Sequence, residues 1–198
     1  MTETELSLLD QALLDQDLLL SQGKTIPLAT VRAWMDSDTL QVQDRAFSLL
    51  AEHSERLEMP SPQEREEFSL RYLEHYFRTD PQGGFALGRY QAGYRLCAWF
   101  EQLWSGRPAT AFTLERVRDL LARLSATGEE PMRDALVTAV FEHLFQDPAI
   151  AEFFGDWRRD PALSPVYSEA LALAQLWDKD SDKGSDKEFL YTNEPDRI

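Results

Sequence analysis

The sequence predicts an all-α protein, built as an irregular helical bundle or as a degenerate helical-hairpin solenoid of seven to eight helices. Apolar residues recur at the three- and four-residue spacing of helices, and no sustained apolar–polar alternation indicates strands. Proline follows a short polar residue at five places, which is typical of helix starts. The sequence has no repeat of fixed period, so it does not distinguish a bundle from a solenoid. The five pairs are Ser61-Pro62, Asp80-Pro81, Asp147-Pro148, Asp160-Pro161 and Ser164-Pro165.

The first helix is expected over residues 3–22. Leucines at helical spacing give it one apolar stripe, and Gly23 is expected to end it because glycine suits a helix C-terminus. Acidic residues interrupt the leucines and no basic region precedes them, so a signal peptide is not expected. The stripe consists of Leu6, Leu9, Leu13 and Leu20.

Three more helices are expected in the first half of the chain. A short one follows Pro27, and a longer one covers about 38–58. The next begins at Pro62, where Ser61 and Glu64 have the spacing of a capping box.

The helix expected over about 84–105 is the most apolar and is predicted to lie at the centre of the fold. Gly88 and Ala92 lie four residues apart on it, which lets a neighbouring helix approach closely. Thr113 is expected to cap the following helix, which ends near Gly128.

The remaining elements complete one domain. A helix is expected over about 130–146, short turns over 148–155 and 161–163, and a last helix over 165–177. We therefore assign residues 1–177 to a single all-helical domain. Residues 178–198 are expected to form an acidic, mobile tail because they hold few apolar residues.

The charge of the chain excludes some classes of partner. Its 198 residues carry 35 acidic and 20 basic side chains, a net charge of −15. Nucleic acids and anionic membranes are not expected as partners, because phosphate binding needs clustered Lys and Arg. No stretch approaches the roughly 20 apolar residues of a transmembrane helix. We expect a cytoplasmic protein.

No motif predicts catalysis, a metal or a cofactor. The tail from Asp178 alternates carboxylates as a calcium loop does, but Phe189 stands where a bidentate Glu is required. Cys97 is the single cysteine and lies among apolar residues, where a thiol is inert. Each histidine directly follows a Glu, and neighbours on a helix point about 100° apart, too far to share an ion. The histidines are His53, His75 and His143.

Arginines and tyrosines gather in the middle of the chain. They form either a local basic surface on an acidic protein or helix salt bridges to Glu67, Glu74 and Glu101, and we favour the second interpretation. The cluster comprises Arg71, Arg78, Arg89, Tyr90, Tyr94, Arg95 and Arg107.

One stretch resembles a known group of proteins. Residues 141–154, read FEHLFQDPAIAEFF, are followed by Trp157 and by the run DPAL over 160–163. This pattern resembles small helical bacterial proteins of uncharacterised function, and it is similar to immunity partners of secreted polymorphic toxins. The resemblance implies a toxin-binding role and supplies no catalytic residues.

The first functional hypothesis is therefore a cytoplasmic immunity protein that binds and neutralises a cognate toxin, one with a basic surface, by stoichiometric interaction. The alternative is a helical adaptor or regulator that binds a peptide or helix in an apolar groove. An enzyme without a recognisable motif is the third. An acidic inhibitor would gain fast, electrostatically steered association with a cationic toxin. The predicted partner-binding residues are Asp10, Asp15, Asp17, Asp36, Asp38, Glu129, Glu130, Asp134, Asp156 and Asp160.

Overall fold

The computed structural model describes residues 25–80, 82–83 and 86–184. Over these residues the fold is all-α, as predicted, with one pair of two-residue strands. The helix expected over 3–22 and the end of the predicted tail lie outside the described residues. The elements are α2 (Leu28–Met35), α3 (Leu40–Glu52), η1 (Ser54–Arg56), α4 (Pro62–Thr79), β1 (Gln82–Gly83), β2 (Ala86–Leu87), α5 (Arg89–Ser105), α6 (Ala111–Thr127), α7 (Glu130–Leu136), the π-helical η2 (Val137–Phe141), α8 (Glu142–Leu144), α9 (Pro148–Phe153), η3 (Gly155–Arg159) and α10 (Ser164–Gly184).

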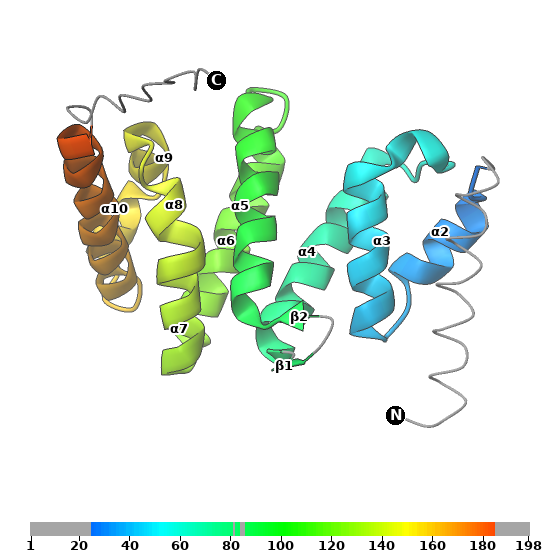
Figure 1. Cartoon of the computed structure of the whole chain (residues 1–198), viewed down its shortest axis with the longest axis horizontal. Coiled ribbons are helices and arrows are strands. Elements are labelled where there is room, and N and C mark those ends of the chain that lie inside the picture. Colours follow the sequence, from blue (N-terminus) through cyan, green and yellow to red (C-terminus); the bar gives the residue numbers. More distant parts are fainter. Residues whose placement is uncertain (1–24, 81, 84–85, 185–198) are drawn as a thin grey trace, which may run out of the picture.

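The helices stand side by side in a row, with α2 at one end and α10 at the other (Figure 1). Most contacts join helices that follow one another in the chain, such as α2 with α3 and α5 with α6. Further contacts join α4 to α6 and α5 to α7, so the helices pack as irregularly stacked hairpins. The helix α5 contacts α4, α6, α7 and η2, which gives it the central position that its apolar sequence predicts.

The two ends of α4 show one correct and one wrong prediction. The Ser61 hydroxyl accepts a hydrogen bond from the Glu64 amide, and the Glu64 carboxylate accepts one from the Ser61 amide, so the capping box is present. The helix start expected at Asp80-Pro81 is wrong. Asp80 instead ends α4 in the left-handed conformation, with φ 46°, which Asp tolerates better than most residues.

The helix α5 begins at Arg89, later than the predicted start near residue 84. Before it, β1 and β2 pair antiparallel, with Gln82 opposite Leu87. Gly88 then adopts φ 67°, a backbone conformation that favours glycine. The role predicted for Gly88, to admit a neighbouring helix, belongs instead to a residue one turn further on.

That residue is Gly93, where α5 meets η2. A Cβ atom on Gly93 would lie 2.6 Å from the Cβ of Ala139, so only glycine permits this approach. The hydrogen-bonding pattern is π-helical at this place, over Val137–Phe141. The Cys97 thiol, one turn further along α5, is buried and donates to the carbonyl of Ala139 at 3.4 Å. Burial raises the pKa of Cys97 to about 12. The thiol therefore stays protonated and unreactive, as the sequence predicts.

The prediction that Thr113 caps α6 is wrong. The helix begins at Ala111, and the Thr113 hydroxyl donates at 2.6 Å to the carboxylate of Glu66 on α4. A long-range partner therefore replaces the local backbone partner. Gly128 follows the last residue of α6, as expected.

Two other helices differ in length from the prediction. α3 ends at Glu52 rather than near 58. The short helix η1 follows at Ser54–Arg56, and Leu57 then pairs with Ile26 in a parallel bridge. α10 continues to Gly184, beyond the predicted end at residue 177.

The core between α5 and α10 is rich in aromatic rings. The Phe154 ring lies 5.0–5.9 Å, centroid to centroid, from five others. Phe145 also contacts Tyr167 of α10 at 5.1 Å. Rings at these separations attract one another beyond the effect of burial alone. The rings around Phe154 belong to Phe100, Phe141, Phe145, Phe153 and Trp157.

Candidate partner-binding site

A groove of about 690 Å³ opens where α3, α4, α5 and α6 meet. We call it the α3–α6 groove. Its polar residues include Arg65, Glu66 and Arg116. Its lining is largely apolar, which is typical of sites that bind peptides or small molecules. The apolar residues include Phe47, Leu50, Trp99, Leu103, Ala109 and Phe112.

Phe112 is the most exposed of the large apolar side chains in the described part of the chain, at 74%. It stands in the first turn of α6, whose buried stripe includes Leu114, Val117 and Leu121. Two helical steps of about 100° place Phe112 well away from Leu114 around the helix axis. A large apolar residue outside the buried stripe is a signal present in the sequence, and our sequence analysis missed it.

Glu66 joins the two helices on either side of the groove. Its carboxylate accepts hydrogen bonds from the Thr113 hydroxyl at 2.6 Å and from Arg116 at 2.5 Å. Both donors lie on α6, and Glu66 lies on α4. The contact holds α6 against α4 and orients the turn that carries Phe112.

Arg65 brings an unsatisfied donor to the same groove. Its Nε atom is buried and has no hydrogen-bond partner among the described residues. Burying such a donor costs about 1–3 kcal/mol.

Beneath the groove lies a polar network that holds α3, α4 and α5 together. The Tyr72 hydroxyl donates to Asp44 at 2.6 Å, and Arg95 lies 3.0 Å from the same carboxylate. Burial and the neighbouring Asp44 raise the pKa of Tyr72 above its usual range, so it stays a protonated donor. The Phe47 ring, which lines the groove, stacks on Tyr72 at 4.7 Å. The apolar side of the groove is thus anchored to a rigid base.

A second groove, of about 640 Å³, lies between α4 and α6 and is polar. Glu74 accepts from Arg78 at 2.8 Å and lies 3.6 Å from Arg123. Asp119 and Glu67 add further negative charge to its lining. Four arginines of the cluster are therefore engaged in ion pairs, and the favoured interpretation is correct for them, although Glu74 is the one predicted acid among their partners. The other partners are Asp36, Asp44 and Asp80, and Arg107 instead donates to the Trp104 carbonyl.

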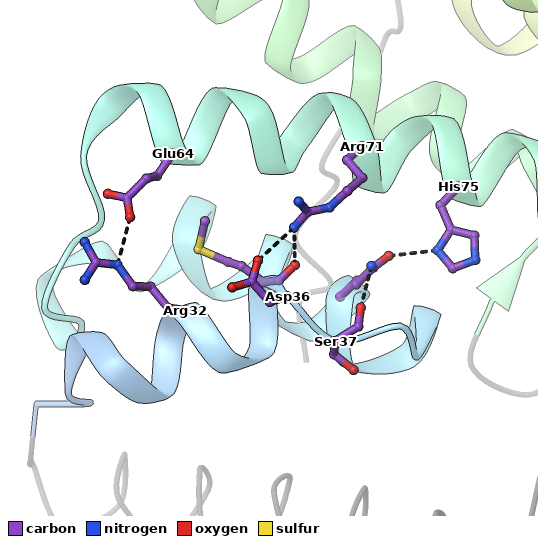
Figure 2. Close-up of polar contacts among 8 residues, drawn as sticks. Arg32, Asp36, Ser37, Glu64, Arg71 and His75 are labelled. Carbon is purple, nitrogen blue, oxygen red and sulfur yellow. Dashed lines mark hydrogen bonds and ion pairs between the residues drawn. The ribbon is translucent and has the colours of Figure 1, made fainter.

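Polar contacts also join α2 and the start of α3 to α4 (Figure 2). Arg32 donates to Glu64 at 2.8 Å, and this contact, with Ser61, lowers the pKa of Glu64 to about 2. Arg71 points from α4 toward α2 and donates to the Met35 carbonyl at 2.6 Å. His75 pairs with the Gln43 side chain, which donates to the Ser37 carbonyl. His75 therefore serves to join α4 to α3 by hydrogen bonding.

The predicted acidic residues do not form one site. Asp10, Asp15 and Asp17 lie outside the described residues. Asp36 pairs with Arg71 and Asp156 pairs with Arg118, so both are compensated. The Asp160 carboxylate accepts from the Ala162 amide within a turn.

The remaining predicted acids are Asp38, Glu129, Glu130 and Asp134. All four are exposed, and within the described ranges none has an ion-pair partner. Asp38 precedes α3, whereas the other three lie at the start of α7, across α5 from it (Figure 1). The acidic surfaces on either side of α5 are separate.

The described residues contain no group of three or more His, Cys, Asp or Glu side chains that could hold a metal ion. His53 and His143 are exposed, and the His143 ring lies 5.8 Å from that of Tyr94. Across the same residues, no helix has both the length and the apolar character needed to cross a membrane.

Comparison with known proteins found no family model, no curated protein and no solved structure that matches this chain. The function therefore has to be argued from the geometry of the described residues.

Proposed function

We propose that this protein acts by binding another protein stoichiometrically, and that the α3–α6 groove receives an apolar segment of that partner. The observation that carries the proposal is Phe112, 74% exposed at the edge of an apolar groove. Exposed apolar surface of this kind marks interaction sites. This is the adaptor-like mode that the sequence allows as an alternative.

The groove suits an amphipathic helix or an extended peptide. Recognition of a helix in a groove uses a few apolar anchors at helical spacing, and aromatic residues carry much of the energy. Burying one Phe side chain contributes about 1.5–3 kcal/mol. Phe112 and Trp99 together can therefore supply a substantial share of a micromolar affinity, which corresponds to about 8 kcal/mol.

The experiment is a calorimetric titration of the purified protein with the product of the neighbouring gene. We expect a one-to-one complex. Phe112→Ala should weaken it at least tenfold, which is about 1.4 kcal/mol. Leu176→Ala is the matched control, because Leu176 is also exposed, at 58%, but lies on α10 at the far end of the row. Equal affinities for both variants and the natural protein would contradict the groove as the site.

The partner that we propose is a cognate bacterial toxin, which this protein neutralises in the cytoplasm without catalysis. The acidic net charge and the resemblance of residues 141–154 support it. A further support is the start of α7, where Glu129, Glu130 and Asp134 are exposed and without ion-pair partners among the described residues. Such charges speed association with a cationic surface.

Two measurements test this identity. Co-expression should rescue cells from the toxin encoded beside this gene, and no rescue would contradict the proposal. Glu130→Lys should slow association several-fold at low salt, and the difference should shrink at about 500 mM salt, where the Debye length is a few ångströms. Glu169→Lys makes the same charge change on α10 and should have a smaller effect.

A further inference from the structure

We propose that the leucine-bearing segment of this chain, residues 6–20, binds in the α3–α6 groove when no partner is present. The inference rests on the proposed function in one respect, since the segment would then compete with the partner for the groove.

The segment carries the apolar and charged groups that the groove would accept. Leu6, Leu9, Leu13 and Leu20 recur at helical spacing. Every charged residue before Lys24 is acidic. The acids are Glu3, Glu5, Asp10, Asp15 and Asp17.

The groove offers the complementary groups. Phe112, Trp99 and Leu103 form an apolar wall for leucine side chains. Arg65 and Arg116 lie beside this wall. Arg116 is already paired with Glu66, so Arg65, which has no ion pair among the described residues, is the cation left for a carboxylate of the occupant. A segment that carries both leucines and carboxylates can contact the apolar wall and Arg65 together.

The chain enters the described structure beside the segment 56–58, which precedes the groove residue Pro62. Ile26 donates from its amide to the Arg56 carbonyl at 2.8 Å and accepts from the Glu58 amide at 2.9 Å. Ile26 also pairs with Leu57 in a parallel bridge, and Leu57 lies five residues before Pro62, which lines the groove. Fifteen residues in a helix would span about 22 Å, and residues 21–25 separate them from Ile26.

Binding within one chain has a mechanistic consequence. A tethered segment acts at an effective concentration in the millimolar range. A partner that needs the same groove binds only the fraction of molecules in which the groove is open, so its apparent affinity falls by that fraction. The segment would thus set a threshold for partner binding.

Disulfide trapping in the full-length chain tests the inference. The pair Leu13→Cys with Ala109→Cys places one thiol on the segment and one at the groove. The control pair is Leu13→Cys with Ala126→Cys, because Ala126 is also an exposed alanine but lies at the opposite end of α6. The natural Cys97 is buried and hydrogen-bonded to backbone carbonyls, so it does not compete. Both variants are first checked for an unchanged circular dichroism spectrum and thermal midpoint.

Under oxidised glutathione we expect an intramolecular disulfide in the groove pair, at least tenfold more abundant than in the control pair. Equal yields in the two pairs would overturn the inference. A disulfide-linked dimer of the groove pair would also overturn it, because the occupant would then be a second copy. The same experiment with Leu9→Cys in place of Leu13→Cys detects a segment that binds one helical turn further along the groove.

A second measurement separates this inference from the proposed function. The double variant Leu9→Asp with Leu13→Asp should bind the partner about tenfold more tightly, because it releases the groove. An unchanged affinity alongside equal trapping yields would overturn the inference and leave groove binding intact. Trapping in the groove pair, together with no effect of Phe112→Ala on the partner, would support the inference and contradict the proposed function.

Discussion

The two ends of the helix row are held together by different chemistry. At the N-terminal end, charged and polar side chains join α2, α3 and α4, as the pairs Arg32–Glu64 and Asp44–Tyr72 show. At the C-terminal end, aromatic rings around Phe154 fill the space between α5 and α10. The first end should respond to pH and to the loss of single polar atoms, and the second to the loss of volume.

The difference also bears on where partners bind. Polar contacts hold α3 and α4 in position without filling every space between helices, and the α3–α6 groove lies on that side of α5. The aromatic core is tightly packed, with Gly93 allowing α5 to reach η2. A close-packed interior transmits changes of volume directly into stability.

The largest effect is expected for Phe154→Ala. Removing a fully buried ring from the aromatic core should lower the free energy of unfolding by about 3–5 kcal/mol. Phe112→Ala removes the same atoms from an exposed position and should change it by no more than about 0.5 kcal/mol. Urea denaturation of the two variants gives both values, and similar losses would contradict the assignment of Phe112 to the surface.

The next effect concerns Gly93→Ala, which adds one methyl group. The new Cβ would lie 2.6 Å from the Ala139 Cβ, so α5 and η2 would have to separate, at a cost of about 1–3 kcal/mol. Gly155→Ala is the control, because its nearest neighbours are the ends of the flexible Glu152 and Arg158 side chains. A smaller loss of thermal stability for Gly93→Ala than for Gly155→Ala would refute the close approach.

A matched pair of tyrosines on α4 tests the polar contacts at the N-terminal end of the row. Tyr72→Phe removes the donor to Asp44 and should cost about 1–2 kcal/mol in the free energy of unfolding. The Tyr76 hydroxyl is buried and has no partner among the described residues, so Tyr76→Phe should be neutral or stabilising. Chemical denaturation of both variants is the measurement, and the opposite ranking would contradict the network.

The smallest effect is expected for Glu64→Gln, which keeps an acceptor for the Ser61 amide and removes the charge. The pKa of Glu64 is lowered from 4.5 to about 2, so its charged form stabilises the folded protein above about pH 4.5. This contribution is lost as the pH falls from 4.5 toward 2. The thermal midpoints of variant and natural protein should therefore differ at pH 7 and converge toward low pH.

Glu67→Gln is the control for that series, since Glu67 is exposed on the same helix and accepts from Gln63. It makes the same chemical change on α4 without removing the Arg32 contact, so the excess of the Glu64→Gln difference over this control belongs to that contact. A constant difference for Glu64→Gln from pH 7 to pH 3 would show that the Arg32 contact contributes nothing.

Local patterns in the sequence predicted most helix positions. Ser61 caps α4, and the Asp147 side chain accepts from the Ala149 amide at the start of α9. The two wrong cap predictions share one cause. Thr113 and Asp80 look like caps, but Thr113 bonds to Glu66, and Asp80 accepts from the Arg89 amide nine residues later. A capping residue whose partner lies far along the chain cannot be recognised from its neighbours.

The sequence by itself determined the all-α class and the starts of α4 and α9, because helix periodicity and capping depend on residues within four positions of each other. Only the tertiary structure decided which helix faces meet. It brought Phe47, Trp99 and Phe112 to one groove from three helices, and it placed Gly93 against Ala139. These contacts join residues 13 to 65 positions apart, and their geometry follows from packing of whole helices, which no local pattern encodes.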